Sequence, residues 1–127
     1  MKASSPSERS RYSNMITILL VDDDLLYRRA IKRAILSWGW RVKEAGDGVE
    51  AIELIKETDL VLSDIDMPNM NGIELSIKIK SSNPNFPVLL MSGGYTDIGD
   101  IGDFLPKPSK IELIKFKIEE MINSRRK

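Results

Sequence analysis

Residues 18–24 read Ile-Leu-Leu-Val-Asp-Asp-Asp, four apolar residues that run directly into three carboxylates. A polar residue follows an apolar run three more times: residues 60–64 read Leu-Val-Leu-Ser-Asp, residues 88–92 read Val-Leu-Leu-Met-Ser, and residues 104–107 read Phe-Leu-Pro-Lys. Short apolar runs are typical of buried strands in a parallel sheet. Ligands of such sheets bind outside the carboxyl ends of the strands, so we expect these polar residues to converge on one site.

Amphipathic helical patterns alternate with the apolar runs. We expect strands over residues 16–21, 41–45, 60–63, 87–91 and 104–106, and helices over residues 25–37, 48–56, 73–80 and 111–124. This alternation predicts an α/β fold in which right-handed crossovers place helices on both faces of a parallel sheet.

The length of 127 residues fits one domain, which we place at residues 15–127. Residues 1–14 are rich in serine and charge, and we expect them to form a disordered leader. The 19 basic and 19 acidic residues balance, so the net charge gives no reason to expect nucleic acid or membrane binding. Neither a membrane-spanning apolar run nor a secretory signal is evident, so a cytoplasmic location is the expectation.

The chain contains no cysteine and no histidine. The first absence excludes disulfides, thiolate metal sites and cysteine catalysis. The second excludes histidine-based acid–base or triad chemistry within this chain. Any phosphohistidine that takes part in its chemistry must therefore belong to another molecule.

Carboxylates dominate the predicted site. Asp22, Asp23 and Asp64 would repel one another unless a cation neutralised them, and an all-oxygen cluster favours a hard cation such as Mg²⁺. Lys107 would add a compact positive charge for a phosphoryl group, and Ser92 a hydroxyl donor. Without histidine or cysteine the plausible nucleophile is a carboxylate, which predicts formation of an aspartyl phosphate.

Four ordered motifs resemble the receiver domain of two-component response regulators, the CheY-like family. They are LLVDDD at residues 19–24, SDIDMPNMNG at 63–72, LLMSGG at 89–94 and DFLPKP at 103–108, and the resemblance runs from Ile16 to near the C-terminus. It implies a flavodoxin-like, doubly wound, five-stranded parallel sheet in the order 2-1-3-4-5. It also implies a signalling domain rather than an enzyme, limited to self-catalysed phosphotransfer and autodephosphorylation.

The resemblance assigns roles to the acidic residues by motif position. It implies that Asp64 is the phosphoacceptor and that Asp22 and Asp23 are the acidic pair that binds Mg²⁺ together with Asp64. The backbone carbonyl of Asp66 would be a further metal ligand. The implied partners are a sensor histidine kinase or phosphotransfer protein, which donates the phosphoryl group, and a downstream protein target.

The same resemblance assigns the remaining site residues. Ser92 matches the hydroxyl that switches conformation, Lys107 matches the lysine that contacts the phosphoryl group, and Phe104 matches the switch aromatic. The Lys107-Pro108 peptide bond is expected to be cis.

The segment at residues 93–102 departs from the family. Its 10 residues include four glycines, and a parallel crossover with its helix needs at least ~10–12 residues. We therefore expect the family's fourth helix to be missing or reduced to a turn. Since that helix contributes to the usual dimer surface of receivers, we do not expect the usual symmetric dimer.

Other interpretations of the same residues remain. Asp64-Ile65-Asp66 also fits the Asp-x-Asp motif of haloacid-dehalogenase-like phosphatases, although that family places the motif on its first strand. A pseudo-receiver would keep the fold as a binding module without being phosphorylated. Asp24 is expected to cap the following helix, and Phe104 has an ordinary alternative as a core residue.

Overall fold

The computed structural model describes residues 16–94 and 102–125. Five parallel strands form one sheet in the order β2-β1-β3-β4-β5, which confirms the predicted fold class and strand order. The strands are β1 (Thr17–Val21), β2 (Arg41–Ala45), β3 (Leu60–Asp64), β4 (Val88–Ser92) and β5 (Asp103–Pro106). The described helices are α2 (Leu25–Ser37), α3 (Gly48–Leu54), α4 (Gly72–Ser82) and α5 (Ile111–Arg125), with a 3-10 turn η2 (Ile55–Glu57) after α3.

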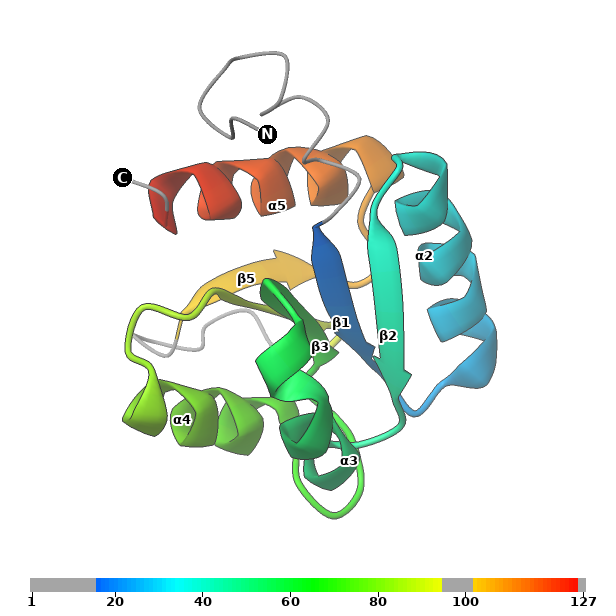
Figure 1. Cartoon of the computed structure of the whole chain (residues 1–127). Helices are drawn as coiled ribbons and strands as arrows, with labels where there is room; N and C mark the ends of the chain where they lie inside the picture. Colours follow the sequence, from blue (N-terminus) through cyan, green and yellow to red (C-terminus); the bar gives the residue numbers. More distant parts are fainter. Residues whose placement is uncertain (1–15, 95–101, 126–127) are drawn as a thin grey trace.

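Figure 1 shows α2 and α5 on one side of the sheet and α3 and α4 on the other. Alternate residues of a strand point to opposite faces, and β1 follows this rule. Ile18 and Leu20 are buried in the core beneath α2 and α5, whereas Leu19 and Val21 are buried beneath α3 and α4. Both faces of the central strands are covered, which explains why their sequences are apolar throughout rather than alternating.

Polar side chains fix where the helices begin. Asp24 caps α2 by accepting a hydrogen bond from the Tyr27 backbone N–H at 3.1 Å, as expected. This leaves Asp22 and Asp23 outside the cap. Asn71 and Glu74 form a reciprocal capping box at the start of α4.

Gly72 allows the loop after β3 to fold back against that strand. Its N–H donates to the Ile65 carbonyl at 2.9 Å. A Cβ atom at position 72 would overlap the Asp64 carbonyl oxygen and lie 2.9 Å from the Ile65 Cα. Only glycine therefore permits this approach, which packs the start of α4 against the end of β3.

The predicted leader and most of the predicted short loop after β4 lie in segments that the structure does not describe. The leader at residues 1–14 lies outside the described residues, as does most of the 93–102 segment where the fourth helix of the family was expected to be reduced. Gly93 and Gly94 form a bend after β4. The Lys107-Pro108 peptide bond is cis, as predicted.

Among residues 16–94 and 102–125, no helix combines the length and apolar character needed to cross a membrane.

Candidate functional site

Carboxylates from two strands meet at one edge of the sheet. Asp22 directly follows β1 and is 2% exposed, and Asp64 ends β3 and is 8% exposed. One carboxylate oxygen from each of Asp22, Asp23 and Asp64 lies within 4.8 Å of the others. The structure thus brings together the three acidic side chains that the sequence pattern placed at this site.

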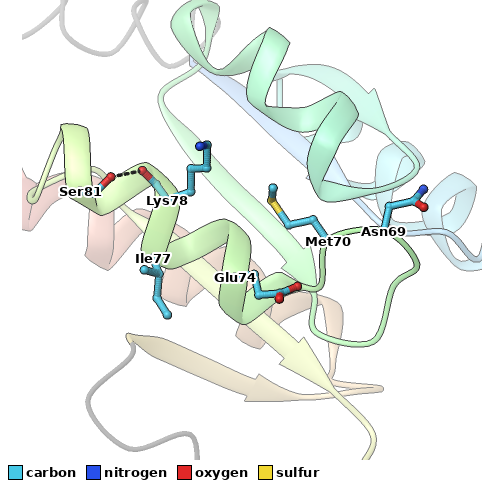
Figure 2. Close-up of a pocket in the computed structure, with 6 residues that line it drawn as sticks. All are labelled: Asn69, Met70, Glu74, Ile77, Lys78 and Ser81. Carbon is cyan, nitrogen blue, oxygen red and sulfur yellow. Dashed lines mark hydrogen bonds between the residues drawn. The ribbon is translucent and has the colours of Figure 1, made fainter.

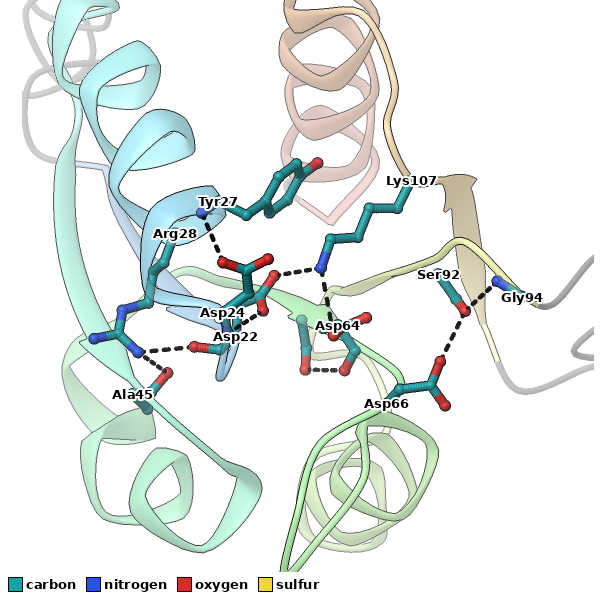
Figure 3. Close-up of polar contacts among 11 residues, drawn as sticks. Asp22, Asp24, Tyr27, Arg28, Ala45, Asp64, Asp66, Ser92, Gly94 and Lys107 are labelled. Carbon is teal, nitrogen blue, oxygen red and sulfur yellow. Dashed lines mark hydrogen bonds and ion pairs between the residues drawn. The ribbon is translucent and has the colours of Figure 1, made fainter.

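Lys107 extends from the end of β5 to these carboxylates, as Figure 3 shows. Its Nζ atom lies 2.9 Å from Asp22 Oδ2 and 3.4 Å from Asp64 Oδ2. The Lys107 side chain is only 18% exposed. The Lys107 N–H donates to the Ser92 carbonyl at 3.0 Å, so the end of β5 is held beside the end of β4.

The charges of the site perturb one another. Burial raises the pKa of Asp64, the Asp22 carboxylate raises it further, and Lys107 only partly offsets these effects. Burial by itself lowers the pKa of Lys107, but Asp22 and Asp64 together outweigh burial and raise it. Lys107 therefore stays an ammonium, while the ionised form of Asp64 is less favourable than that of a free aspartate.

The donor set suits a hard divalent cation. Asp22, Asp23 and Asp64 offer only oxygen atoms, and Mg²⁺ is typically held by one or two carboxylates plus water and phosphate oxygens. The raised pKa of Asp64 points the same way, because a cation would relieve the repulsion between these carboxylates.

Ser92 is 1% exposed at the end of β4. Its hydroxyl donates to Asp66 Oδ2 at 3.4 Å and accepts from the Gly94 N–H at 3.1 Å. The second of the predicted switch residues, Phe104, is half-buried and pairs with Leu90 in the β4–β5 register. It packs against the core beneath α3 and α4.

Arg28 is a site residue that the sequence analysis did not single out. Its Nη1 atom donates to the Asp22 carbonyl at 2.7 Å, and its Nε atom donates to Glu44 at 3.0 Å. Lys32 lies 2.7 Å from the other oxygen of Glu44. Arg28 thus connects the loop after β1 to β2 and holds the backbone that carries Asp22.

Tyr27 is a second residue that the sequence analysis did not identify. The Lys107 Nζ atom lies 4.4 Å from the centre of its ring. Burial raises the pKa of Tyr27, Lys107 partly counters that rise, and Asp22 and Asp64 add to it. The phenol is therefore neutral at physiological pH.

A hollow of about 440 Å³ lies along α4 (Figure 2), and none of Asp22, Asp23 and Asp64 lines it. It is lined by Asn69, Met70, Glu74, Ile77, Lys78 and Ser81. Its carboxylate, that of Glu74, already accepts a hydrogen bond from the Asn71 N–H at 2.9 Å. We therefore place the reactive site at the sheet edge and not in this hollow.

Comparison with known proteins agrees with this geometry. The family model described as the response regulator receiver domain matches residues 18–119. A cyclic di-GMP phosphodiesterase of Thermotoga maritima is 34% identical over 118 residues, which cover 87% of this chain and 32% of that protein. The probable transcriptional regulatory protein TcrX of Mycobacterium tuberculosis is 31% identical over 118 residues, covering 84% of this chain and 50% of that protein.

Solved structures show the same likeness. The crystal structure of a CheY-like response regulator receiver domain protein from Methanospirillum hungatei superimposes with a TM-score of 0.80 at 25% identity, covering 88% of this chain and 97% of that one. The two curated relatives are longer proteins, of which this chain spans half or less. The likeness therefore concerns the receiver portion that they share. The chain belongs to the response regulator receiver domain family of two-component signalling.

Proposed function

We propose that the chain accepts a phosphoryl group on Asp64 from a phosphohistidine of another protein, with Mg²⁺ held by Asp22, Asp23, Asp64 and the backbone carbonyl of Asp66. The observation that carries this proposal is the position of Lys107, whose ammonium contacts the carboxylates of both Asp22 and Asp64. A half-buried ammonium beside a paired carboxylate and a candidate nucleophile supports phosphoryl transfer, which depends on positioning and charge stabilisation.

The transfer balances as a single displacement. An oxygen of the Asp64 carboxylate attacks phosphorus, the phosphorus–nitrogen bond of the donor histidine breaks, and the ring nitrogen keeps the electron pair. Mg²⁺, when held by the carboxylates of the site, would supply positive charge for the phosphoryl oxygens. The ammonium of Lys107, which contacts Asp22 and Asp64, would add to this charge. Later attack by water on phosphorus would release inorganic phosphate and return Asp64 to its carboxylate.

The donor is a sensor histidine kinase or a phosphotransfer protein, because the chain has no histidine of its own. The output is a change of contact with a downstream protein. In the structure the Ser92 hydroxyl is directed to Asp66 at 3.4 Å, a long hydrogen bond that costs little to break. We propose that Ser92 turns to the phosphoryl group when Asp64 is modified and that Phe104 repacks in response.

Phosphorylation by a small donor tests this proposal. Wild type, Asp64→Asn and Asp24→Asn are each incubated with acetyl phosphate and Mg²⁺, and intact mass spectrometry follows the gain of one phosphoryl group. Asp24→Asn is the matched control, because it makes the same chemical change at a helix cap where asparagine serves as well as aspartate. We expect labelling of wild type and Asp24→Asn that chelation of Mg²⁺ abolishes.

Asp64→Asn should remain unlabelled. Equal labelling of Asp64→Asn would show that another residue is the acceptor. Absence of labelling in wild type, with phosphohistidine donors as well, would instead favour a pseudo-receiver that signals by binding alone. Steady turnover of a phosphomonoester would be required for a phosphatase.

A further inference from the structure

The ring of Tyr27 lies next to the lysine of the site. Lys107 Nζ is 4.4 Å from the ring centre, well within the roughly 6 Å over which an aromatic face attracts a cation. Figure 3 shows the Tyr27 side chain beside the extended Lys107 chain, above the carboxylates. These residues come from opposite ends of the sequence, so the contact is made by the fold.

A hydrogen bond in the first turn of α2 fixes the backbone position of Tyr27. Its N–H donates to Asp24 Oδ1 at 3.1 Å, which sets the first turn of α2. The next residue, Arg28, donates from its side chain to the Asp22 carbonyl at 2.7 Å. The same turn that positions Asp22 therefore also positions the ring.

The ring face, and not the hydroxyl, makes the relevant contact. The Tyr27 hydroxyl oxygen is buried and has no hydrogen-bond partner among the residues that the structure describes. A buried hydroxyl without a partner does not stabilise the fold. What tyrosine supplies at this position is an aromatic face, which a phenylalanine would also supply and a leucine would not.

The contact matters because Lys107 would otherwise be held by carboxylates alone. Its ammonium contacts Asp22 at 2.9 Å and Asp64 at 3.4 Å. Once Asp64 carries a phosphoryl group, the charge moves to the phosphoryl oxygens and the carboxylate contact changes. A neutral aromatic face keeps attracting the ammonium in both states, so it can hold Lys107 near the place where the phosphoryl oxygens arrive.

We propose that Tyr27 is a positioning residue for phosphoryl binding: the face of its ring holds the Lys107 ammonium between Asp22 and Asp64. This inference rests on the proposed function, because it assigns Lys107 to the phosphoryl group. Together with Arg28, it adds α2 to the strand ends that build the site.

Two variants separate positioning from packing. Tyr27→Phe keeps the aromatic face and removes the buried hydroxyl, whereas Tyr27→Leu keeps an apolar side chain and removes the ring. Affinity for beryllofluoride, a mimic of the aspartyl phosphoryl group, is measured by amide NMR titration with Mg²⁺ present. We expect Tyr27→Phe to match wild type and Tyr27→Leu to bind about three- to tenfold more weakly.

Two further measurements show whether a loss of beryllofluoride affinity comes from the missing ring. Affinity for Mg²⁺ alone should be equal in all three proteins, because the three carboxylates are unchanged. The protons next to the Lys107 ammonium should show an upfield ring-current shift in wild type and Tyr27→Phe that is lost in Tyr27→Leu. The wild-type shift stays informative even if the leucine variant does not fold, and its absence would overturn the proposal.

The outcomes distinguish a failure of the positioning role of Tyr27 from a failure of phosphorylation at Asp64. If wild type binds beryllofluoride and Tyr27→Leu binds it equally well, Tyr27 only packs and the positioning role is wrong, while phosphorylation of Asp64 stands. If wild type binds no beryllofluoride, the proposed function fails and the role of Tyr27 fails with it.

Discussion

The Nζ atom of Lys107 lies 2.9 Å from Oδ2 of Asp22, although 85 positions separate the two residues in the sequence. Asp22 follows β1, an interior strand of the sheet, whereas Lys107 follows β5 at its edge. Asp64, at the end of β3, lies 3.4 Å from the same ammonium. The site therefore exists only when the sheet is assembled, and its charges contribute to the stability of the fold.

Replacing Lys107 with methionine should destabilise the protein in Mg²⁺-free buffer. The change leaves the buried carboxylates of Asp22 and Asp64 without their ammonium, and breaking a buried ion pair from one side costs about 3 kcal/mol. Urea unfolding measures the loss. Lys110→Met, at an exposed lysine nearby, should stay within about 0.5 kcal/mol of wild type. Equal stability of Lys107→Met and wild type would contradict the buried pairing.

Asp64→Asn should be more stable than wild type without Mg²⁺. Burial and the Asp22 carboxylate raise the pKa of Asp64, so its ionised form is less favourable in the folded than in the unfolded chain. We expect a gain of roughly 1 kcal/mol in the free energy of unfolding. Asp24→Asn, outside the cluster, should leave it unchanged. A loss of stability in Asp64→Asn would mean that the carboxylate is net stabilising.

Glu44 should make the free energy of unfolding depend on pH. The hydrogen bond from Lys32 lowers the pKa of Glu44, burial partly opposes this, and Arg28 lowers it further, so the net shift is downward from 4.5. A carboxylate whose pKa is lower in the folded than in the unfolded chain stabilises the fold at pH values above its unfolded pKa. This stabilisation is lost as the pH falls through the folded pKa.

Glu44→Gln should therefore lower the unfolding free energy at pH 7 by up to about 1 kcal/mol. The difference from wild type should shrink as pH falls from 7 towards 3, because a growing share of Glu44 is then protonated in the folded as well as the unfolded state. Unfolding at both pH values checks this. A difference that does not depend on pH would show that Glu44 acts through packing and not through charge.

Gly72→Ala should destabilise the protein and disturb the site. An added Cβ would overlap the Asp64 carbonyl oxygen, so the loop after β3 must shift, at a cost of about 2 kcal/mol. The matched control is Gly94→Ala, where an added Cβ meets no atom within 4 Å. If both variants unfold at the same urea concentration, the close approach at Gly72 is not a constraint.

The sheet and its acidic edge could be predicted from sequence because each rests on a local pattern. An apolar run followed by a charged residue marks the carboxyl end of a buried strand, and parallel strands bring those ends together. Asp22, Asp64 and Lys107 were found in this way. The helix predicted over residues 48–56 was less accurate: it changes to a 3-10 turn at Ile55, one turn before the chain enters β3.

Contacts made only by tertiary packing could not be predicted. Arg28 carries no sequence signal that marks it as part of the site. Its partners lie on a neighbouring strand and in the loop after β1: Glu44 and the Asp22 carbonyl. Tyr27 gave no signal either, because its partner is Lys107, at the far end of the chain. The roles of Ser92 and Phe104 in switching, and the reduced helix in residues 93–102, stay predictions.

The claim that Asp64 is a working phosphoacceptor can be checked by an amide NMR titration of the wild-type protein with Mg²⁺ and beryllofluoride. We expect saturable shifts of the Ser92 and Lys107 amides in wild type, and none of these shifts in Asp64→Asn. Equal shifts in Asp64→Asn, or no response of wild type at saturating Mg²⁺ and beryllofluoride, would contradict the claim.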